Sequence, residues 1–416
     1  MATRDTIHLC LARPSDEGLE LKYIHQAFDT NWIVPLGPNV DAFERDLSLY
    51  YGRPVCAMNS ATSALHIALL LMGVQRGDEV LVQSFTFCAT VNPVCYIGAH
   101  PIFVDSERDT WNMSPALLEK AIRDRIEKTG RKPKAIIVVD LYGMPAKMDE
   151  ILRIARDNDI PVLEDSAESM GSVYRGHRSG TMCDYAVVSF NGNKMITTSG
   201  GGALICPDDK QRQLALKYAT QAREKCSYYQ HELIGYNYRM SNVCAGIGRG
   251  QMTVLDRHVE HHRHLHQLYS DAFRHIDGIQ VHQAPGPDYA SNYWLTTLSL
   301  DPDIITVDGQ EHTPAADTYG QPDSNIEALV PHLAQAHIET RPLWKPLHLQ
   351  PVFSRLYHLR QPRDFGTLLV GPTCSAYLNG VSDDLFSHGL CLPSGPCVSD
   401  DDARYVVDTI MQHIQR

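Results

Sequence analysis

A lysine in a glycine-rich turn is the residue of this chain best placed to do chemistry. Lys194 ends the segment SFNGNK at residues 189–194, and a second glycine-rich stretch, TTSGGG, follows at residues 197–202. A lysine amine forms an imine with an aldehyde only as the free base. It therefore needs a sheltered site and a partner group that organises the aldehyde.

A candidate partner lies upstream of the lysine. Asp165 ends the run PVLED at residues 161–165, which is typical of a buried strand and its exit. A lysine and an aspartate are the pair that pyridoxal phosphate (PLP) requires. The lysine holds the aldehyde, and the aspartate pairs with the protonated pyridine nitrogen. The two residues together predict PLP as the cofactor.

Short apolar runs indicate how these two residues are positioned. The runs are rich in β-branched residues and do not alternate with polar ones, as expected of strands buried on both faces. They lie at residues 80–82, 102–104, 135–139, 161–163, 186–188 and 203–205. Amphipathic helical patterns separate them, and one begins at Ser114 and Pro115 and ends at Gly130. We predict an α/β fold with a mainly parallel sheet, whose ligand lies at the carboxyl ends of the strands.

The second half of the chain has a different pattern. A long helical pattern at residues 242–275 is expected to lead out of the large domain, and residues 280–282 and 293–300 are typical of strands. Residues 301–324 predict an exposed loop, and residues 400–414 a terminal helix with Ser399 as its N-cap. We expect a large PLP-binding α/β domain at residues 1–255 and a smaller α+β domain at residues 256–416.

Composition excludes several classes of partner. The chain has 416 residues, 43% of them hydrophobic and 21% charged, as in ordinary globular proteins. A formal net charge of -12 argues against nucleic acid or an anionic membrane as the main partner. No signal peptide or membrane span is expected, and the eleven scattered cysteines form no CxxC pair. Reduced thiols and a cytoplasmic location are predicted.

Two further segments could contact a cofactor. Residues 59–63, NSATS, precede an apolar helical pattern, and the amide groups of such a helix start can bind phosphate. Ser and Thr at this place are more often simple caps. Phe85 and Phe87 follow a predicted strand and could stack on a planar ring, although core packing is the commoner role of phenylalanine.

Six ordered motifs give the chain from about residue 21 onward a resemblance to a known family. It resembles the DegT/DnrJ/EryC1/StrS family of PLP-dependent sugar aminotransferases, which implies the type I, aspartate aminotransferase-like fold. The motifs are NSATSALH at 59–66, SFTF at 84–87, EDSAESMG at 164–171, SFNGNK at 189–194, GYNYRMS at 235–241 and TRPLWKPLH at 340–348.

The resemblance implies roles for the residues at matching positions. Lys194 is expected to hold the cofactor aldehyde, and Asp165 the pyridine nitrogen. Phe87 is expected to stack on the ring. Ala61 and Thr62 are expected to bind the phosphate.

Five more positions take implied roles in the same way. Ser189 is expected to add a hydroxyl to the phosphate site. Glu168 stands where many family members carry a glutamine near the ring oxygen. Asn237 is expected to reach the phosphate of the neighbouring subunit's cofactor, which implies a homodimer with shared sites. Arg341 and His348 are expected to approach the nucleotide sugar.

The implied reaction is an amino transfer from L-glutamate to a nucleotide-linked keto sugar. Residues 164–169 and 339–351 look most like members that act at C4 of UDP-linked 4-keto-6-deoxy-N-acetylhexosamines for bacterial surface polysaccharide or glycan synthesis. The family also contains sugar dehydratases, which carry a histidine at the lysine position, so Lys194 favours transamination. A dehydratase and a catalytically silent scaffolding member remain the alternatives.

Other chemical signals have simpler interpretations. His258, His262 and His266 recur at helical spacing and could bind a metal, but a solvated helix face is the expected role, and no metal site is predicted. The stretch GIGRG at residues 246–250 follows no predicted strand, so helix packing is expected there rather than dinucleotide binding. Asp105 and Asp140 are expected to act as strand-end caps.

Overall fold

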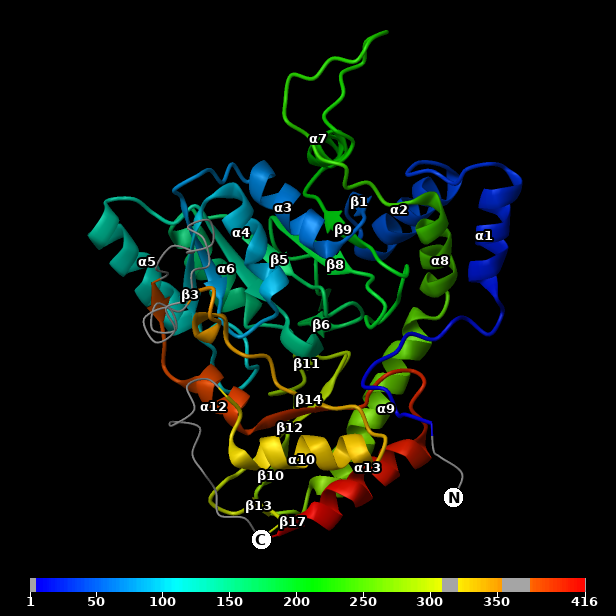
Figure 1. Cartoon of the computed structure of the whole chain (residues 1–416). Coiled ribbons are helices and arrows are strands. Elements are labelled where there is room, and N and C mark those ends of the chain that lie inside the picture. Colours follow the sequence, from blue (N-terminus) through cyan, green and yellow to red (C-terminus); the bar gives the residue numbers. More distant parts are fainter. Residues whose placement is uncertain (1–4, 309–320, 354–374, 416) are drawn as a thin grey trace, which may run out of the picture.

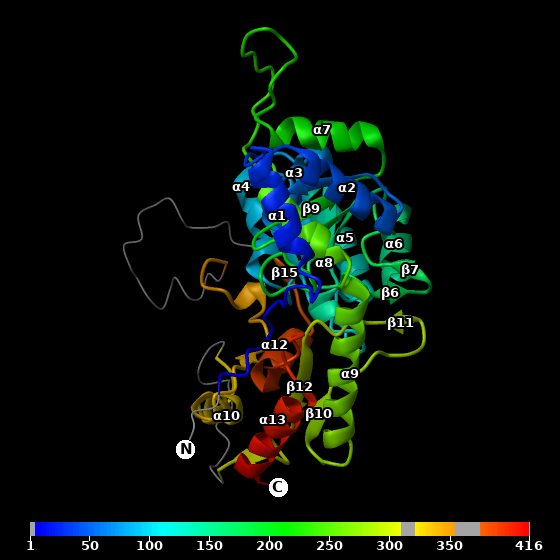
Figure 2. The same ribbon diagram turned by 90° about the vertical axis from the view of Figure 1, so that its right-hand side faces the viewer.

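The computed structural model describes residues 5–308, 321–353 and 375–415. Its described part forms a large α/β region and a smaller α+β region, which lie one above the other and are joined by a long helix, α9 (Figures 1 and 2). Half of the loop expected at residues 301–324, residues 309–320, falls outside these ranges.

An eight-stranded sheet forms the centre of the large region (Figure 1). Its spatial order is β1 (Val55–Met58), β9 (Gly202–Ile205), β8 (Tyr185–Ser189), β5 (Val162–Asp165), β4 (Ala135–Val139), β2 (Glu79–Gln83), β3 (His100–Val104) and β15 (Ala376–Tyr377). β9 is antiparallel to both neighbours, and the other pairs are parallel. The predicted α/β class and mainly parallel sheet are confirmed.

The strands are mainly apolar because helices cover both faces of the sheet. On β2, Val80 and Val82 pack against the face that carries α3, whereas Leu81 packs against the face that carries α5 and α6. Successive side chains of a strand point to opposite faces, so a run without polar residues fits only a doubly covered sheet. The helices are α3 (Ala61–Leu71), α4 (Asn92–Ile97), α5 (Pro115–Thr129), α6 (Met148–Asp157) and α7 (Asp209–Ala219).

The smaller region is built on an antiparallel sheet of order β10 (Ile279–Val281), β12 (Thr296–Leu300), β16 (Gly389–Leu392) and β14 (Arg341–Pro342). Its core packs these strands against α9 (Leu255–Phe273), α10 (Ser324–Gln335) and α13 (Asp400–His413). Ser399 caps α13 through a reciprocal capping box with Asp402, as the sequence predicted for this helix start.

The helical pattern expected at residues 242–275 is divided in the structure into α8 (Asn242–Met252) and α9 by a turn at Thr253 and Val254, and α9 leads out of the large region (Figure 1). α8 packs on α1 (Leu19–Asp29) and α2 (Pro38–Tyr51), whereas α9 packs in the smaller region. A Cβ at Gly248 would lie 2.6 Å from Phe43, so the glycines of α8 serve close helix packing, as expected.

The remaining elements are short. They are α12 (Val381–His388), β6 (Val173–Tyr174), β7 (His177–Arg178), β11 (Tyr289–Ala290), β13 (Thr306–Val307), β17 (Ile414–Gln415) and the 3-10 turns η1 (Cys88–Thr90), η2 (Leu141–Gly143) and η4 (Leu347–Leu349). The segment between α7 and α8 projects away from the large region in both views (Figures 1 and 2).

Two properties of the described residues concern disulfide bonds and membrane spans. The ten cysteines in the described ranges are all free thiols. None of the described helices has the length and apolar character needed to cross a bilayer.

Candidate active site

A cavity of about 240 Å³ lies where β5 and β8 end, at the carboxyl edge that the sequence predicted. It contains seven of the sites expected from the sequence and two tryptophans that were assigned no role. The residues used below are Ala61, Thr62, Phe87, Asp165, Glu168, Ser189, Lys194, Trp294 and Trp344.

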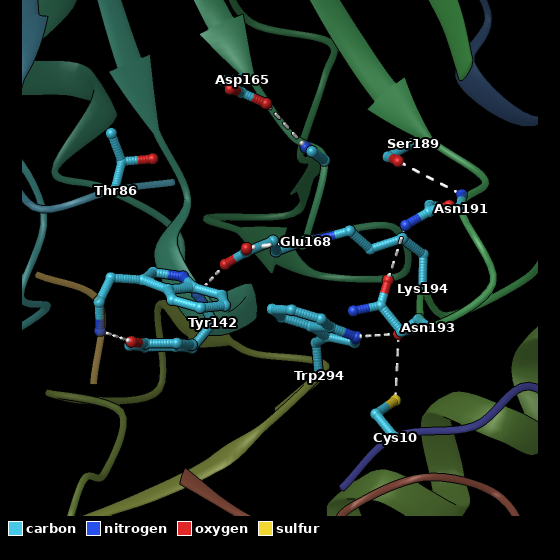
Figure 3. Close-up of polar contacts among 12 residues, drawn as sticks. Cys10, Thr86, Tyr142, Asp165, Glu168, Ser189, Asn191, Asn193, Lys194 and Trp294 are labelled. Carbon is cyan, nitrogen blue, oxygen red and sulfur yellow. Dashed lines mark hydrogen bonds and ion pairs between the residues drawn. The ribbon is translucent and has the colours of Figure 1, made fainter. Parts of the chain in front are cut away.

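Lys194 is held inside this cavity by contacts on two sides (Figure 3). Its Nζ lies 3.3 Å from Oε1 of Glu168 and 3.8 Å from the centre of the Trp294 ring. Its side chain is only 12% exposed, and its amide donates to the carbonyl of Asn191 at 3.0 Å. The Trp294 indole N–H donates to the carbonyl of Asn193 at 2.6 Å, which fixes the tryptophan to the lysine turn. The lysine therefore has the sheltered setting that imine chemistry needs.

Asp165 ends β5 on the same side of the sheet and is buried. Its Oδ2 accepts the Thr90 hydroxyl at 2.8 Å, and its Oδ1 accepts the amide of Ala167 at 3.2 Å. Burial raises the pKa of Asp165 to about 6, and the bond from Thr90 opposes that rise. The carboxyl group is therefore mainly ionised at neutral pH, as pairing with a protonated ring nitrogen requires.

Glu168 is oriented from two directions. Its Oε2 accepts the amide of Tyr142 at 2.7 Å, and its carbonyl accepts the side-chain amide of Asn292 at 2.9 Å. The Tyr142 hydroxyl in turn accepts the backbone amide of Trp344 at 2.7 Å, and the two rings stack with centroids 6.0 Å apart. The indole nitrogen of Trp344 is buried and has no hydrogen-bond partner among the described residues.

The start of α3 forms one wall of the cavity. The Ser60 hydroxyl caps the helix by accepting the amide of Ser63 at 3.0 Å. Ala61 and Thr62 form the first turn and line the cavity. Backbone amides and the positive end of a helix dipole are the donors that a phosphate group needs.

A glycine lets a second strand approach this helix start. A Cβ at Gly202 would lie 2.3 Å from the amide nitrogen of Ala61, a distance that no side chain tolerates. Ser189, which pairs with Gly202 across β8 and β9, adds a hydroxyl to the same wall and accepts the amide of Asn191 at 3.4 Å. Gly202 therefore serves close backbone approach at this helix start.

The two phenylalanines of the SFTF motif have different environments. Phe85 is fully buried in the core, as expected for a packing residue. Phe87 is 52% exposed, lines the cavity and contacts Trp344 with ring centroids 5.6 Å apart. Core packing is therefore the wrong interpretation for Phe87, whose free face is available to a planar ring.

Three predicted residues lie outside the cavity lining. Asn237 is exposed, and its carbonyl accepts the side-chain amide of Asn59 at 3.3 Å. Arg341 is exposed and pairs with Glu339 at 3.0 Å. His348 is nearly buried, and its Nδ1 lies 2.7 Å from the hydroxyl of Ser84. Their expected roles toward a partner subunit or a nucleotide sugar stay predictions.

The three histidines of α9 are not on a solvated face, so that expectation is wrong. His258, His262 and His266 are all buried. Their ring nitrogens lie 2.9–3.3 Å from backbone carbonyl oxygens of Met195, Tyr293 and His282 respectively. The sequence pattern is charged, but α9 bridges the two regions and is covered there by neighbouring segments.

A different group of possible metal ligands occurs in the smaller region. Within the described residues, ligand atoms of Asp308, His332 and His413 lie within 4.8 Å of one another. The Asp308 carboxylate forms ion pairs with both histidines, at 2.6 Å and 3.1 Å. These contacts satisfy the three side chains as they stand.

Sequence reasoning missed three residues that shape the site. Thr90 reaches Asp165 because it stands one helical turn after Thr86, with which it also shares a hydrogen bond of 3.0 Å. That spacing was visible in the sequence. Trp294 and Tyr142 come from distant segments and reach Lys194 and Glu168 only through the tertiary fold.

The fold and this cavity together define a PLP enzyme of the type I class. The helix-start amides, the free ring of Phe87, the ionised Asp165 and the sheltered Lys194 match the four parts of the cofactor. When bound, PLP supplies an aldehyde that receives the amino group and a ring that accepts the electron pair.

The chain belongs to the DegT/DnrJ/EryC1/StrS aminotransferase family, which matches residues 14–411. It is 44% identical over 406 residues to EpsN of Bacillus subtilis (96% of this chain, 94% of the relative), which is named as a candidate PLP-dependent aminotransferase. It is 33% identical to GDP-perosamine synthase of Escherichia coli O157:H7, with 96% of both chains covered. Over 61% of this chain and 69% of the relative, it is 33% identical to UDP-4-amino-4,6-dideoxy-N-acetyl-beta-L-altrosamine transaminase of Campylobacter jejuni.

A solved structure agrees with this assignment. An aminotransferase of the same family from Brucella abortus is 26% identical, covers 95% of both chains and superposes with a TM-score of 0.80. The protein is a PLP-dependent sugar aminotransferase.

Proposed function

We propose that this enzyme transfers the amino group of L-glutamate to C4 of a UDP-linked 4-keto-6-deoxy-N-acetylhexosamine for bacterial surface polysaccharide or glycan synthesis. The observation that carries the transfer chemistry is the position of Lys194 Nζ, 3.3 Å from Glu168 in a sheltered cavity. The UDP-linked class is supported by residues 164–169 and 339–351 and by the relative from Campylobacter jejuni. The relative named for a GDP-linked sugar makes a GDP-linked keto sugar the second candidate.

The residues of the cavity have separate roles in the transfer. Lys194 Nζ moves a proton to and from the carbon that carries the amino group, since it is the basic nitrogen inside the cavity. Asp165 keeps a proton on the ring nitrogen and so favours uptake of the electron pair. Glu168 holds Lys194 Nζ on one side, and the Trp294 ring limits its movement on the other.

We propose a homodimer with shared sites, in which Asn237 contacts the phosphate of the partner subunit's cofactor. Asn237 is exposed and lies next to the helix-start residue Asn59. The projecting segment before it carries exposed apolar side chains, among them Tyr228, Tyr229 and Ile234. Exposed apolar groups concentrated on one segment favour an interface with another chain.

A mixed dimer tests the shared site. Asn237→Ala and Lys194→Ala chains are each expected to be inactive or nearly so as homodimers. Their heterodimer is expected to regain one intact site and therefore activity, because one of its two sites contains both native residues. A mixture that regains no activity after subunit exchange, although dimers form, contradicts the shared site.

The absorption spectrum tests the donor, and product analysis tests the acceptor. Addition of L-glutamate to the purified enzyme with PLP is expected to convert the yellow form into the pyridoxamine form. The converted enzyme is then mixed with UDP-linked and GDP-linked 4-keto-6-deoxy sugars, and products are identified by mass spectrometry. Amination of only the GDP-linked sugar contradicts the proposed UDP class. A dehydrated product contradicts transamination, and Lys194→Ala protein is the control for both steps.

A further inference from the structure

Two acidic residues meet on the face of the sheet opposite the cofactor cavity. In the pairing of β4 with β5, Val138 lies opposite Glu164 and Val139 opposite Asp165. Asp140 follows Val139 directly, so its side chain falls on the same face as that of Glu164, and Asp165 falls on the other face. The carboxyl groups of Asp140 and Glu164 are close enough to hydrogen-bond with each other.

Both carboxyl groups are buried and are bound mainly by uncharged donors. Oε1 of Glu164 accepts the Ser166 hydroxyl at 2.9 Å and the amide of Gly180 at 2.5 Å. Asp140 accepts the amide of Ala146 and the hydroxyl of Ser169, each at 2.9 Å. Oε2 of Glu164 is buried and meets no other donor in the described ranges. A buried acceptor beside a second carboxyl group is satisfied when one proton lies between them.

The groups that face this pair supply no compensating positive charge. Across the described ranges, neither Asp140 nor Glu164 forms an ion pair with a lysine, arginine or histidine. Tyr51 of α2 and Cys183 before β8 also face the pair, and burial raises both of their pKa values well above the usual range. Burial, followed by repulsion from Asp140, raises the pKa of Glu164 to about 8.

We propose that Asp140 and Glu164 share one proton and together act as positioning residues for the turn that carries Glu168. Ser166 and Ser169, at the two ends of this turn, each donate a hydroxyl to one member of the pair. The proton allows two acids to bind these donors at once without the repulsion of two buried negative charges.

The same pair also fixes the segment that binds Glu168 from its other side. Asp140 accepts the amide of Ala146, which follows the turn containing Tyr142, and the Tyr142 amide donates to Glu168. Loss of the shared proton is therefore expected to move Glu168, and with it the contact to Lys194 at 3.3 Å. These contacts are present in the protein without a ligand, and they do not depend on which sugar is the substrate.

Thermal unfolding of the apoprotein as a function of pH tests the shared proton. Glu164→Gln supplies an N–H in place of that proton. The folded wild type retains a proton that the unfolded chain releases above its ordinary pKa, so the wild type loses stability as pH rises toward about 8. The difference in thermal unfolding midpoint, Glu164→Gln minus wild type, is expected to grow from pH 5 to pH 8 and then to level off. A difference that is constant with pH overturns the shared proton.

The positioning role needs a second measurement, because a stability change alone does not show it. The rate of the half-reaction with L-glutamate is followed from pH 6 to pH 10. The wild-type rate is expected to fall above about pH 8, where the pair ionises, whereas Glu164→Gln keeps its rate and stays within about threefold of wild type at pH 7. Glu164→Ala, which removes the acceptor, is expected to lose at least about tenfold at every pH.

Asp149→Asn is the matched control for charge, since the Asp149 carboxylate is bound by Arg175 and lies outside the pair. It is expected to keep the wild-type pH dependence in both measurements. The proposal is overturned if the half-reaction rate of Glu164→Gln falls above about pH 8 as it does in the wild type. It is also overturned if this fall in rate disappears in Asp149→Asn.

Discussion

The amine of Lys194 and the carboxylate of Glu168 lie 3.3 Å apart, and the second oxygen of that carboxylate accepts the amide of Tyr142 at 2.7 Å. The Glu168 side chain thereby links the lysine, which follows β8, to the turn after β4, with β5 between these two strands in the sheet. With the Trp294 ring 3.8 Å from Nζ on its other side, the amine has few positions to occupy. Such restriction favours catalysis by a base that transfers a proton to and from one carbon atom.

Replacement of Lys194 by Ala is expected to abolish turnover and to remove the borohydride-reducible linkage to PLP, because the cavity then lacks its nucleophilic amine. Mass spectrometry after reduction measures the linkage, and the glutamate half-reaction measures the chemistry. A PLP mass increase after borohydride reduction that is as large in the Lys194→Ala protein as in the wild type would falsify the assignment.

Asp165→Asn is expected to lower the half-reaction rate by orders of magnitude, since a neutral amide does not hold a proton on the ring nitrogen. The pH dependence is also expected to change. The pKa of Asp165 is raised to about 6, so its negative charge is present above that pH and is lost as pH falls through it. PLP affinity of the wild type should therefore weaken below about pH 6 more than that of Asp165→Asn, as measured by fluorescence titration. If the PLP affinities of the wild type and of Asp165→Asn change equally with pH, a charged Asp165 at the cofactor is contradicted.

Gly202→Ala is expected to weaken PLP binding at least about tenfold and to destabilise the protein by about 1–3 kcal/mol, because the added methyl would lie 2.3 Å from the Ala61 amide. Gly200→Ala is the matched control, since a Cβ there meets no atom within 4 Å. Equal PLP affinities for the two variants would show that close approach at Gly202 does not shape the phosphate site.

The buried histidines of α9 predict a loss of stability in acid. Burial lowers the pKa of His266 to about 4, below its ordinary value of 6.5. The unfolded chain takes up this proton first, so the free energy of unfolding falls as pH drops from about 6.5 toward 4, by up to about 3 kcal/mol for this group.

His266→Gln keeps a donor for the carbonyl of His282 but cannot take up the proton, so its unfolding free energy should depend less on pH in this range. Denaturant unfolding between pH 4 and pH 7 measures the slope. His264→Gln, at a half-exposed position paired with Asp400, is the control and should keep the wild-type slope. A slope that is the same in all three proteins would exclude His266 as the source.

The sequence by itself determined the class of fold and the main chemical groups. Apolar runs without alternation require a sheet covered on both faces, and Asp165 and Lys194 follow two such runs. Parallel strands end at one edge, so these two residues had to lie near each other. The cap at Ser399 and the glycines of α8 were equally readable, because their signals lie within one or two helical turns.

Only the tertiary structure decided which distant groups complete the site. Trp294 lies over Lys194, and Tyr142 binds Glu168, although no local pattern links either pair. The break at Thr253 and the burial of His262 were likewise invisible, because a charged helical pattern does not reveal which neighbours will cover it. Caps, turns and periodicity depend on residues a few positions apart. Burial and contact depend on how whole elements pack, which the chain sets only when it folds.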